Sequence, residues 1–76
     1  MFGQNTYRFS MNVDRETLLA VYEGTIRRIR VKTDEGLVLD IDAQHLKAFT
    51  TPDGIYGRFE LKTSKENKFI GISKIG

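Results

Sequence analysis

Charges of opposite sign are separated into two adjacent stretches of this 76-residue chain. Residues 25–33 carry four bases and no acid, and residues 34–42 carry four acids and no base. Asp34-Glu35-Gly36 stands at the junction and has the composition of a turn. Two strands that meet at such a turn place opposite charges across from each other, so the pattern predicts a β-hairpin.

Loop chemistry and strand alternation together predict the register of this hairpin. If Gly36 takes the left-handed position of a three-residue loop, a type I turn with a G1 bulge, Thr33 stands opposite Leu37. The pairs that follow are Val31 with Leu39, Ile29 with Ile41, Arg30 with Asp40 and Arg28 with Asp42. A two-residue loop would set apolar residues against charged ones, so it is disfavoured. We therefore expect the acids to neutralise much of the basic cluster.

Alternation of apolar and polar residues predicts an earlier strand over residues 6–13. Asp14 follows it and is the expected N-cap of a helix over residues 14–23. The apolar face expected to lie on a sheet consists of Leu18, Leu19 and Tyr22. We assign this face a structural role in the core, not a role in cofactor binding.

The second half of the chain begins with two local turns. Asp42 is expected to cap a short helical turn over residues 43–46. Thr51-Pro52-Asp53-Gly54 then has the composition of a β-turn, with Pro at the second position and Gly at the fourth. A strand is predicted to start at Ile55 or Tyr56, directly after this turn.

A second hairpin closes the predicted fold. Its loop is expected to comprise four residues, 64–67, and its last strand to end near Ile75. This loop length predicts two cross-strand pairs, Leu61 with Ile70 and Phe59 with Ile72. The last strand carries apolar residues on both faces, so Phe69 and Ile75 are expected to need a cover.

These elements predict an α+β fold for a single domain over residues 1–76. The order is strand, helix and then four strands in two hairpins, which gives a five-stranded, mostly antiparallel sheet with one helix packed on one face. Gly57 and Gly71 lie within strands, where glycine marks bulges and bends. An open sheet and a sheet that curls toward a barrel remain alternatives.

Composition limits the kinds of chemistry that we expect of this chain. The chain has no cysteine, which excludes disulfides, thiolate metal sites and cysteine nucleophiles. It contains no apolar stretch near the roughly 18 residues of a membrane span, so we expect a cytoplasmic protein. A net charge of +2 does not by itself imply a polyanionic partner. With no catalytic motif and no phosphate-loop spacing, we predict a protein without enzymatic activity and without a cofactor.

Two small groups of residues have side chains that could support catalysis or metal binding, contrary to this prediction. His45 lies three positions after Asp42, so the two side chains share one side of a helical turn and suit a general base with its partner. The structural interpretation is favoured, in which Asp42 caps the turn and His45 is a surface or half-buried histidine. Asp40 and Asp42 share a strand face and suit a hard cation, but the predicted opposing arginines disfavour a metal site.

Protein interaction, with homodimerisation as one version, is the favoured function. A sheet of short strands exposes edges, and the first and last strands are the candidate edges here. Another subunit or a partner protein would then cover Phe69 and Ile75, although the helix or Phe2 is the competing cover. The sequence does not identify the partner.

Nucleic-acid binding is the alternative function. The basic stretch supplies Arg27, Arg28, Arg30 and Lys32, and Tyr7, Tyr56 and Phe69 are potential stacking groups. A further candidate surface for a partner or an anionic ligand consists of Arg58, Tyr56 and His45. The competing role for Arg58 is an ion pair with Glu60 or with a neighbouring strand.

Several stretches together carry a family resemblance. The most specific is Asp53-Gly54-Ile55-Tyr56-Gly57-Arg58-Phe59-Glu60-Leu61, and the others are Tyr7-Arg8-Phe9-Ser10, Thr33-Asp34-Glu35-Gly36, His45-Leu46-Lys47-Ala48-Phe49 and Asn67-Lys68-Phe69-Ile70. Over nearly its whole length the chain resembles the small bacterial domain-of-unknown-function family 2835. The resemblance implies a stand-alone proteobacterial protein of about this length. It implies no activity, ligand or catalytic residue.

Overall fold

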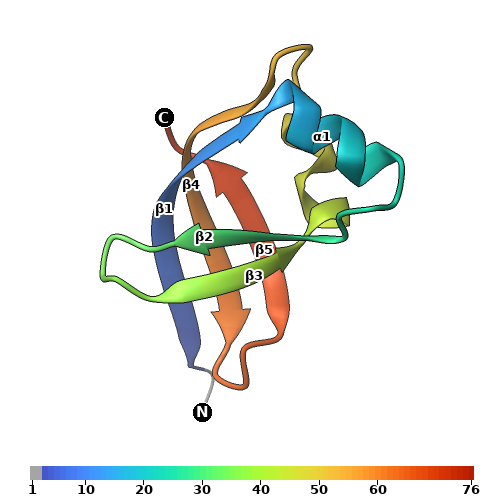
Figure 1. Ribbon diagram of the computed structural model, residues 1–76. Coiled ribbons are helices and arrows are strands. Elements are labelled where there is room, and N and C mark those ends of the chain that lie inside the picture. The colour runs from blue at the N-terminus through green and yellow to red at the C-terminus, as the bar shows by residue number, and fades with distance from the viewer. Residues whose placement is uncertain (1–2) are drawn as a thin grey trace.

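The computed structural model describes residues 3–76, so the expected cover by Phe2 lies outside the described residues. The elements in chain order are β1 (Gln4–Asp14), α1 (Arg15–Tyr22), β2 (Arg28–Lys32), β3 (Val38–Asp42), the 3-10 helix η1 (Ala43–Phe49), β4 (Gly54–Ser64) and β5 (Phe69–Lys74) (Figure 1). This order of strands and helices agrees with the prediction. Within residues 3–76 no helix is long and apolar enough to span a membrane.

The strands divide into two antiparallel sheets, and the predicted single sheet of five strands is not found. β1, β4 and β5 form one sheet in the order β1-β4-β5, and β2 pairs with β3 in the other. The β2–β3 hairpin crosses the larger sheet steeply (Figure 1). A bridge between Phe9 and Thr33 joins the sheets, and the Asp34 N–H donates to the Arg8 carbonyl at 2.8 Å. Because β2 leaves β1 beyond this point, no barrel closes among the described residues.

β1 and β4 form the longest ladder of the fold. Each of the 11 residues of β1 has a partner in β4. Phe9 lies opposite Phe59 at its centre, and both side chains are fully buried with ring centroids 6.2 Å apart. Phe49 from η1 packs edge-on against Phe59 at 5.1 Å. Burial of these aromatic rings supplies a large share of the hydrophobic stabilisation.

The helix begins as predicted but packs through another face. The carboxylate of Asp14 accepts a hydrogen bond from the third helical N–H at 2.8 Å, which is the geometry of an N-cap. Leu18 is buried and Val21 is half-buried, whereas Leu19 and Tyr22 are 49% and 58% exposed. The predicted packing of Leu19 and Tyr22 is therefore wrong. A two-turn helix has two adjacent apolar faces, and contact with β4 selects the one that contains Leu18.

The β2–β3 hairpin confirms the predicted register in every pair. Ile29 lies opposite Ile41, and Arg30 lies opposite Asp40. Gly36 has φ of +91°, the left-handed conformation that the three-residue loop requires. Arg30 Nε is 3.1 Å from Asp40 Oδ1. The neighbouring arginine, at position 28, forms no ion pair within residues 3–76 although it lies opposite Asp42, so neutralisation of the basic strand is partial.

The β4–β5 hairpin is displaced from its predicted register. Leu61 lies opposite Ile72, not Ile70, and Phe59 lies opposite Lys74. Half of the two-residue error comes from the loop, which has three residues because the Ser64 N–H pairs with the Lys68 carbonyl at 2.9 Å. The other half comes from an irregularity in the ladder beside residues 62 and 63, which adds one residue to β5.

Both predicted turns between the hairpins are present. Asp42 caps η1, because its carboxylate accepts a hydrogen bond from the amide two residues later at 3.0 Å, and the helical segment continues to Phe49. Thr51 and Gly54 exchange backbone hydrogen bonds at 2.8 and 3.1 Å across the β-turn. Gly54 has φ of +134°, and a Cβ there would lie 1.9 Å from the Val13 carbonyl oxygen. The close approach of β1 thus requires glycine at the start of β4.

Candidate functional site

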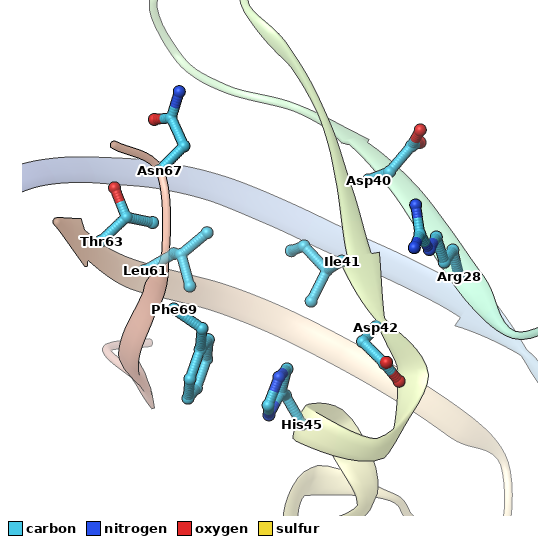
Figure 2. Close-up of a pocket in the computed structure, with 9 residues that line it drawn as sticks. All are labelled: Arg28, Asp40, Ile41, Asp42, His45, Leu61, Thr63, Asn67 and Phe69. Atoms are coloured by element: carbon cyan, nitrogen blue, oxygen red, sulfur yellow. The ribbon is translucent and has the colours of Figure 1, made fainter. Parts of the chain in front are cut away.

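A pocket of about 280 Å³ opens where the β2–β3 hairpin, η1 and the β4–β5 hairpin meet (Figure 2). The three segments follow one another along the chain, but the lining residues lie at positions as far apart as 28 and 69, so the fold brings them together. The lining residues are Arg28, Asp40, Ile41, Asp42, His45, Leu61, Thr63, Asn67 and Phe69.

The floor of the pocket is apolar and rigidly placed. Ile41 from β3 and Leu61 from β4 are both buried, and Figure 2 shows them pointing into the space between the two strands. Thr63 is buried beside them, and its hydroxyl donates to the Ser64 carbonyl at 3.0 Å. Because that hydroxyl is already bonded, the floor offers contact to apolar groups and leaves no unpaired polar atom there.

One wall of the pocket is a pair of stacked aromatic rings. The rings of His45 and Phe69 are 3.7 Å apart between centroids and inclined by 3°. His45 is half-buried, whereas Phe69 is 42% exposed at the start of β5. The stack joins η1 to β5 and presents a flat aromatic surface at the mouth of the pocket.

Charged and amide groups form the rim. Asp40 is held by Arg30, and Asp42 is occupied in capping η1, while Arg28 forms no ion pair among residues 3–76. The Oδ1 atom of Asn67 accepts hydrogen bonds from Asn5 and Tyr7 at 3.4 and 3.3 Å. The rim therefore carries both signs of charge around an apolar floor.

The geometry gives no catalytic pair. Within residues 3–76, His45 makes no hydrogen bond to Asp42, so no carboxylate orients the imidazole as a general base requires. The same part of the chain has no cluster of three or more histidine or carboxylate side chains that would hold a metal ion. What the site can do is bind an apolar or aromatic group and orient it with the rim.

A second hollow of about 450 Å³ continues the pocket along β3 toward the β2–β3 turn. It adds Tyr7 and the segment 37–39, and it shares four residues with the pocket, namely Asp40, Leu61, Thr63 and Asn67. We call the continuous depression the β3 groove. One of its sides is the free edge of β3, because in the described structure β3 pairs with β2 alone.

Comparison with known proteins gives one match. Residues 5–75 match the model of the family described as Protein of unknown function (DUF2835). The chain belongs to this family. No curated protein and no solved structure matches it. The match covers every strand and helix apart from the first residue of β1, so both walls of the β3 groove belong to the DUF2835 domain.

The predicted site residues fall at several places on this DUF2835 domain. Arg28 and His45 both line the pocket. No argument from the sequence had placed these two residues together. Arg27 lines a separate hollow between α1 and η1, and Lys32 is exposed at the end of β2. The Tyr56 hydroxyl donates to the Asp53 carbonyl at 3.1 Å, within its own turn.

Arg58 has a structural partner that the sequence did not suggest. Its guanidinium forms an ion pair with both carboxylate oxygens of Asp34 and donates to Ser10 Oγ at 3.1 Å, while Glu60 pairs with Arg8 at 2.9 Å. The hydrogen bond from Arg58 lowers the pKa of Asp34, and Asp34 raises the pKa of Arg58. This clamp fastens the β2–β3 turn to the outer face of the larger sheet.

Four lining residues, Ile41, Leu61, Thr63 and Asn67, were absent from the sequence-based site candidates, and the first two were expected only as members of cross-strand pairs. Thr63 alternates with Leu61 and Phe59 on the buried face of β4, which was a usable signal. Asn67 has φ of +65°, and asparagine tolerates this left-handed conformation better than most residues. Recognising it would have shortened the predicted loop by one residue.

Proposed function

We propose that this protein is a protein-interaction module that holds an extended segment of a partner in the β3 groove. The observation that carries the proposal is that a groove with a buried apolar floor runs along a free strand edge. An extended peptide satisfies such an edge with main-chain hydrogen bonds and gains specificity by placing alternate side chains in pockets. A cytoplasmic location is part of the proposal, since a chain without cysteine suits a reducing compartment.

The strand edges support this choice of surface. β1 is an edge of the larger sheet, but the contacts of Thr33 and Asp34 with β1 cover part of it. β3 and β5 have no second partner strand within residues 3–76. Unpaired edges invite the addition of another strand.

The size of the pocket supports a side-chain ligand. A volume of about 280 Å³ lies just below the usual range for pockets that take whole small molecules, roughly 300–1,000 Å³. It matches a single large apolar or aromatic residue, which would contact Leu61 below and the His45–Phe69 stack at the side. Such a buried anchor typically carries much of the binding energy of a peptide.

Nucleic-acid binding remains the second candidate because Arg28 lines the same pocket as the aromatic stack. A base that stacks on Phe69 with its phosphate near Arg28 is the arrangement that single-strand binding proteins use. Two observations weigh against it. Asp40 and Asp42 lie at the same rim, and Arg30 is already paired with Asp40.

Selection from a phage-displayed library of short random peptides, followed by amide chemical-shift titration, tests the proposal. We expect selected peptides to shift amides along β3, η1 and the start of β5. Phe69→Ala should weaken their binding about tenfold or more, as loss of a pocket anchor does. Tyr22→Ala is the matched control, because Tyr22 is an exposed aromatic on α1, away from the groove.

Three results would count against the proposal. The first is that selection returns no binder, and the second is that the selected peptides bind the Phe69→Ala protein as tightly as the wild type. Salt-dependent shifts at Arg28 and Lys32 on addition of single-stranded oligonucleotides would favour the nucleic-acid alternative instead. Sedimentation at high protein concentration separates the homodimer version, in which the partner is a second copy, from binding of a different protein.

A further inference from the structure

We infer that the free edge of β5 binds an extended partner segment that carries two carboxylates six residues apart. This inference rests on the proposed interaction role and adds the chemistry of the partner. It concerns the strand next to the β3 groove, with which it shares Phe69.

The excess positive charge of the protein is concentrated at the β4–β5 hairpin. Residues 61–76 carry four bases and one acid, whereas residues 1–60 carry eight bases and nine acids. The four bases are Lys62, Lys65, Lys68 and Lys74. The three ion pairs within residues 3–76 involve none of them. The β4–β5 hairpin therefore offers uncompensated positive charge to a partner.

Two of these lysines bracket the strand. Lys68 immediately precedes β5 and Lys74 is its last residue, and both side chains are exposed. At about 3.4 Å per residue, their Cα atoms lie roughly 20 Å apart along the strand. β4 meets them with residues five positions apart, Ser64 and Phe59, because β5 has one extra residue in that ladder. A partner strand that pairs residue for residue with the free edge of β5 would meet them with residues six positions apart.

Between the lysines, β5 presents apolar side chains that the protein covers only in part. No residue of β5 is buried, and Phe69 and Ile70 are 42% and 47% exposed. Figure 1 shows β5 at the outer side of its sheet, with β4 as its neighbour on the other side. An added strand would cover these side chains and also pair the unsatisfied backbone groups of the edge.

The same charges disfavour a second copy as the occupant. Antiparallel pairing of two β5 strands about Gly71, the register with the greatest overlap of residues 68–74, sets Lys68 of one copy against Lys74 of the other. Like charges directly opposite each other destabilise a strand pair. A nucleic acid would satisfy the lysines but would leave the backbone groups of the edge unpaired. A segment with carboxylates at both ends and β-branched residues between them satisfies every group.

Amide chemical-shift titration with three peptides tests the inference. The probe is Glu-Thr-Val-Thr-Val-Thr-Glu with blocked termini, and the comparison peptides replace both Glu residues by Gln or by Lys. We expect the acidic peptide to shift amides of residues 68–74 and to bind about tenfold tighter than the Gln peptide, with no binding of the Lys peptide. The difference should shrink at high salt.

Variants of the protein sharpen this test. The double substitution Lys68→Glu with Lys74→Glu should reverse the preference, so that the Lys peptide binds and the acidic one does not. Lys68→Gln with Lys74→Gln keeps the side-chain stems and should remove the preference without reversing it, which controls for loss of packing at Gly57 by the Lys74 stem. Lys32→Glu is the matched control, since Lys32 is an exposed strand lysine on the other hairpin.

Each outcome has a separate meaning. Equal binding of the acidic and Gln peptides overturns the inference about carboxylates but leaves the interaction role intact. Absence of binding by all three peptides also overturns it, while the phage selection judges the interaction role independently. Effects of Lys32→Glu as large as those of the β5 substitutions would show that net charge, not the β5 edge, determines binding.

Discussion

The β2–β3 and β4–β5 hairpins close with loops of the same design, although their sequences differ. In the first, the Thr33 N–H donates to the Leu37 carbonyl at 2.7 Å, and in the second the Ser64 N–H donates to the Lys68 carbonyl at 2.9 Å. The hydroxyl of the residue before each loop also accepts a hydrogen bond from the amide of the residue after it, at 3.0 and 3.1 Å. The two loops are therefore the same turn built twice.

The hairpins differ in how strongly their sequences specify the register. Gly36 marks the left-handed position of the first loop, whereas Asn67 takes it in the second and is a weaker signal. Beyond the loop, β2 and β3 have opposite charges on one face and apolar pairs on the other. β5 has one charge, at Lys74, and its apolar residues lie on both faces. The charge pattern and the apolar pattern together specify the register of the β2–β3 hairpin, whereas the apolar pattern alone leaves that of the β4–β5 hairpin open.

The largest effect on the free energy of unfolding should come from shortening an apolar side chain on the second strand of each hairpin. Ile41→Ala on β3 is expected to lower the free energy of unfolding by about 2–5 kcal/mol, because Ile41 is buried. Ile72→Ala on β5 should cost about 1–2 kcal/mol, because Ile72 is half-buried. Urea denaturation monitored by circular dichroism measures both. Equal losses would show that β5 is packed as tightly as β3.

A smaller effect is expected at the left-handed loop positions. Gly36→Ala should lower the free energy of unfolding by about 1–2 kcal/mol through backbone strain, since no atom lies within 4 Å of the added Cβ. If the loops share one design, Asn67→Ala should cost a similar amount, and Asn67→Gly should be tolerated. Thermal unfolding of the three variants measures this. If Asn67→Ala leaves the free energy of unfolding unchanged, the two loops do not share one design.

The ion pair between Arg30 and Asp40 should contribute less again. Both side chains are largely exposed, so a double-mutant cycle with Arg30→Ala and Asp40→Ala should give a coupling free energy of about 0.2–1 kcal/mol. The comparison cycle uses Glu60 and Ser73, which are opposite each other in the other hairpin and whose side chains form no hydrogen bond with each other in the described structure, where Glu60 pairs with Arg8. Coupling of the same size there would remove charge as the distinction between the hairpins.

The smallest effect should depend on pH. The hydrogen bond from Arg58 lowers the pKa of Asp34 in the folded protein, so its stabilisation is complete above the unfolded-state pKa and disappears as the pH falls through the folded-state pKa. Asp34→Asn should therefore lower the Tm at neutral pH, and the difference from wild type should shrink in acid. Lys65, at the equivalent loop position, has no such clamp among the described contacts.

A control at the neighbouring position completes the pH experiment. Glu35→Gln removes a charge from the same loop, and Glu35 forms no hydrogen bond or ion pair within the described residues. Its curve of Tm against pH should follow wild type. A curve that follows Asp34→Asn would assign the effect to net charge in the loop, not to the clamp.

Local signals predicted the local structure of this chain. The caps at Asp14 and Asp42, the Thr51–Gly54 turn and the β2–β3 register each depend on residues within about one turn or one hairpin. The helix face was wrong because contact with β4 selects between two apolar faces, and β4 is far away in sequence. The division into two sheets likewise depends on where β2 leaves β1, after one bridge.

The candidate site was predictable only in part for the same reason. Sequence reasoning named Arg28 and His45 but had no basis for placing them together, because the pocket takes residues from β2, β3, η1, β4, β5 and the loop between the last two strands. Phe69 was identified as a residue in need of a cover, and the structure gives it His45 on one side. The wall of stacked rings is thus a tertiary feature of residues 24 positions apart.

The pairing of β1 with β4 also determines the order in which this chain is able to fold. Every pair in that ladder joins positions between 40 and 60 residues apart, so the ladder forms only after a long loop has closed, which is a slow step. The β2–β3 hairpin needs only residues 28–42 and is free to form earlier. During synthesis β1 is made first, but it is unable to pair until β4, the last strand but one, has been made. Pulse-labelled amide exchange during refolding should accordingly protect β3 before β1.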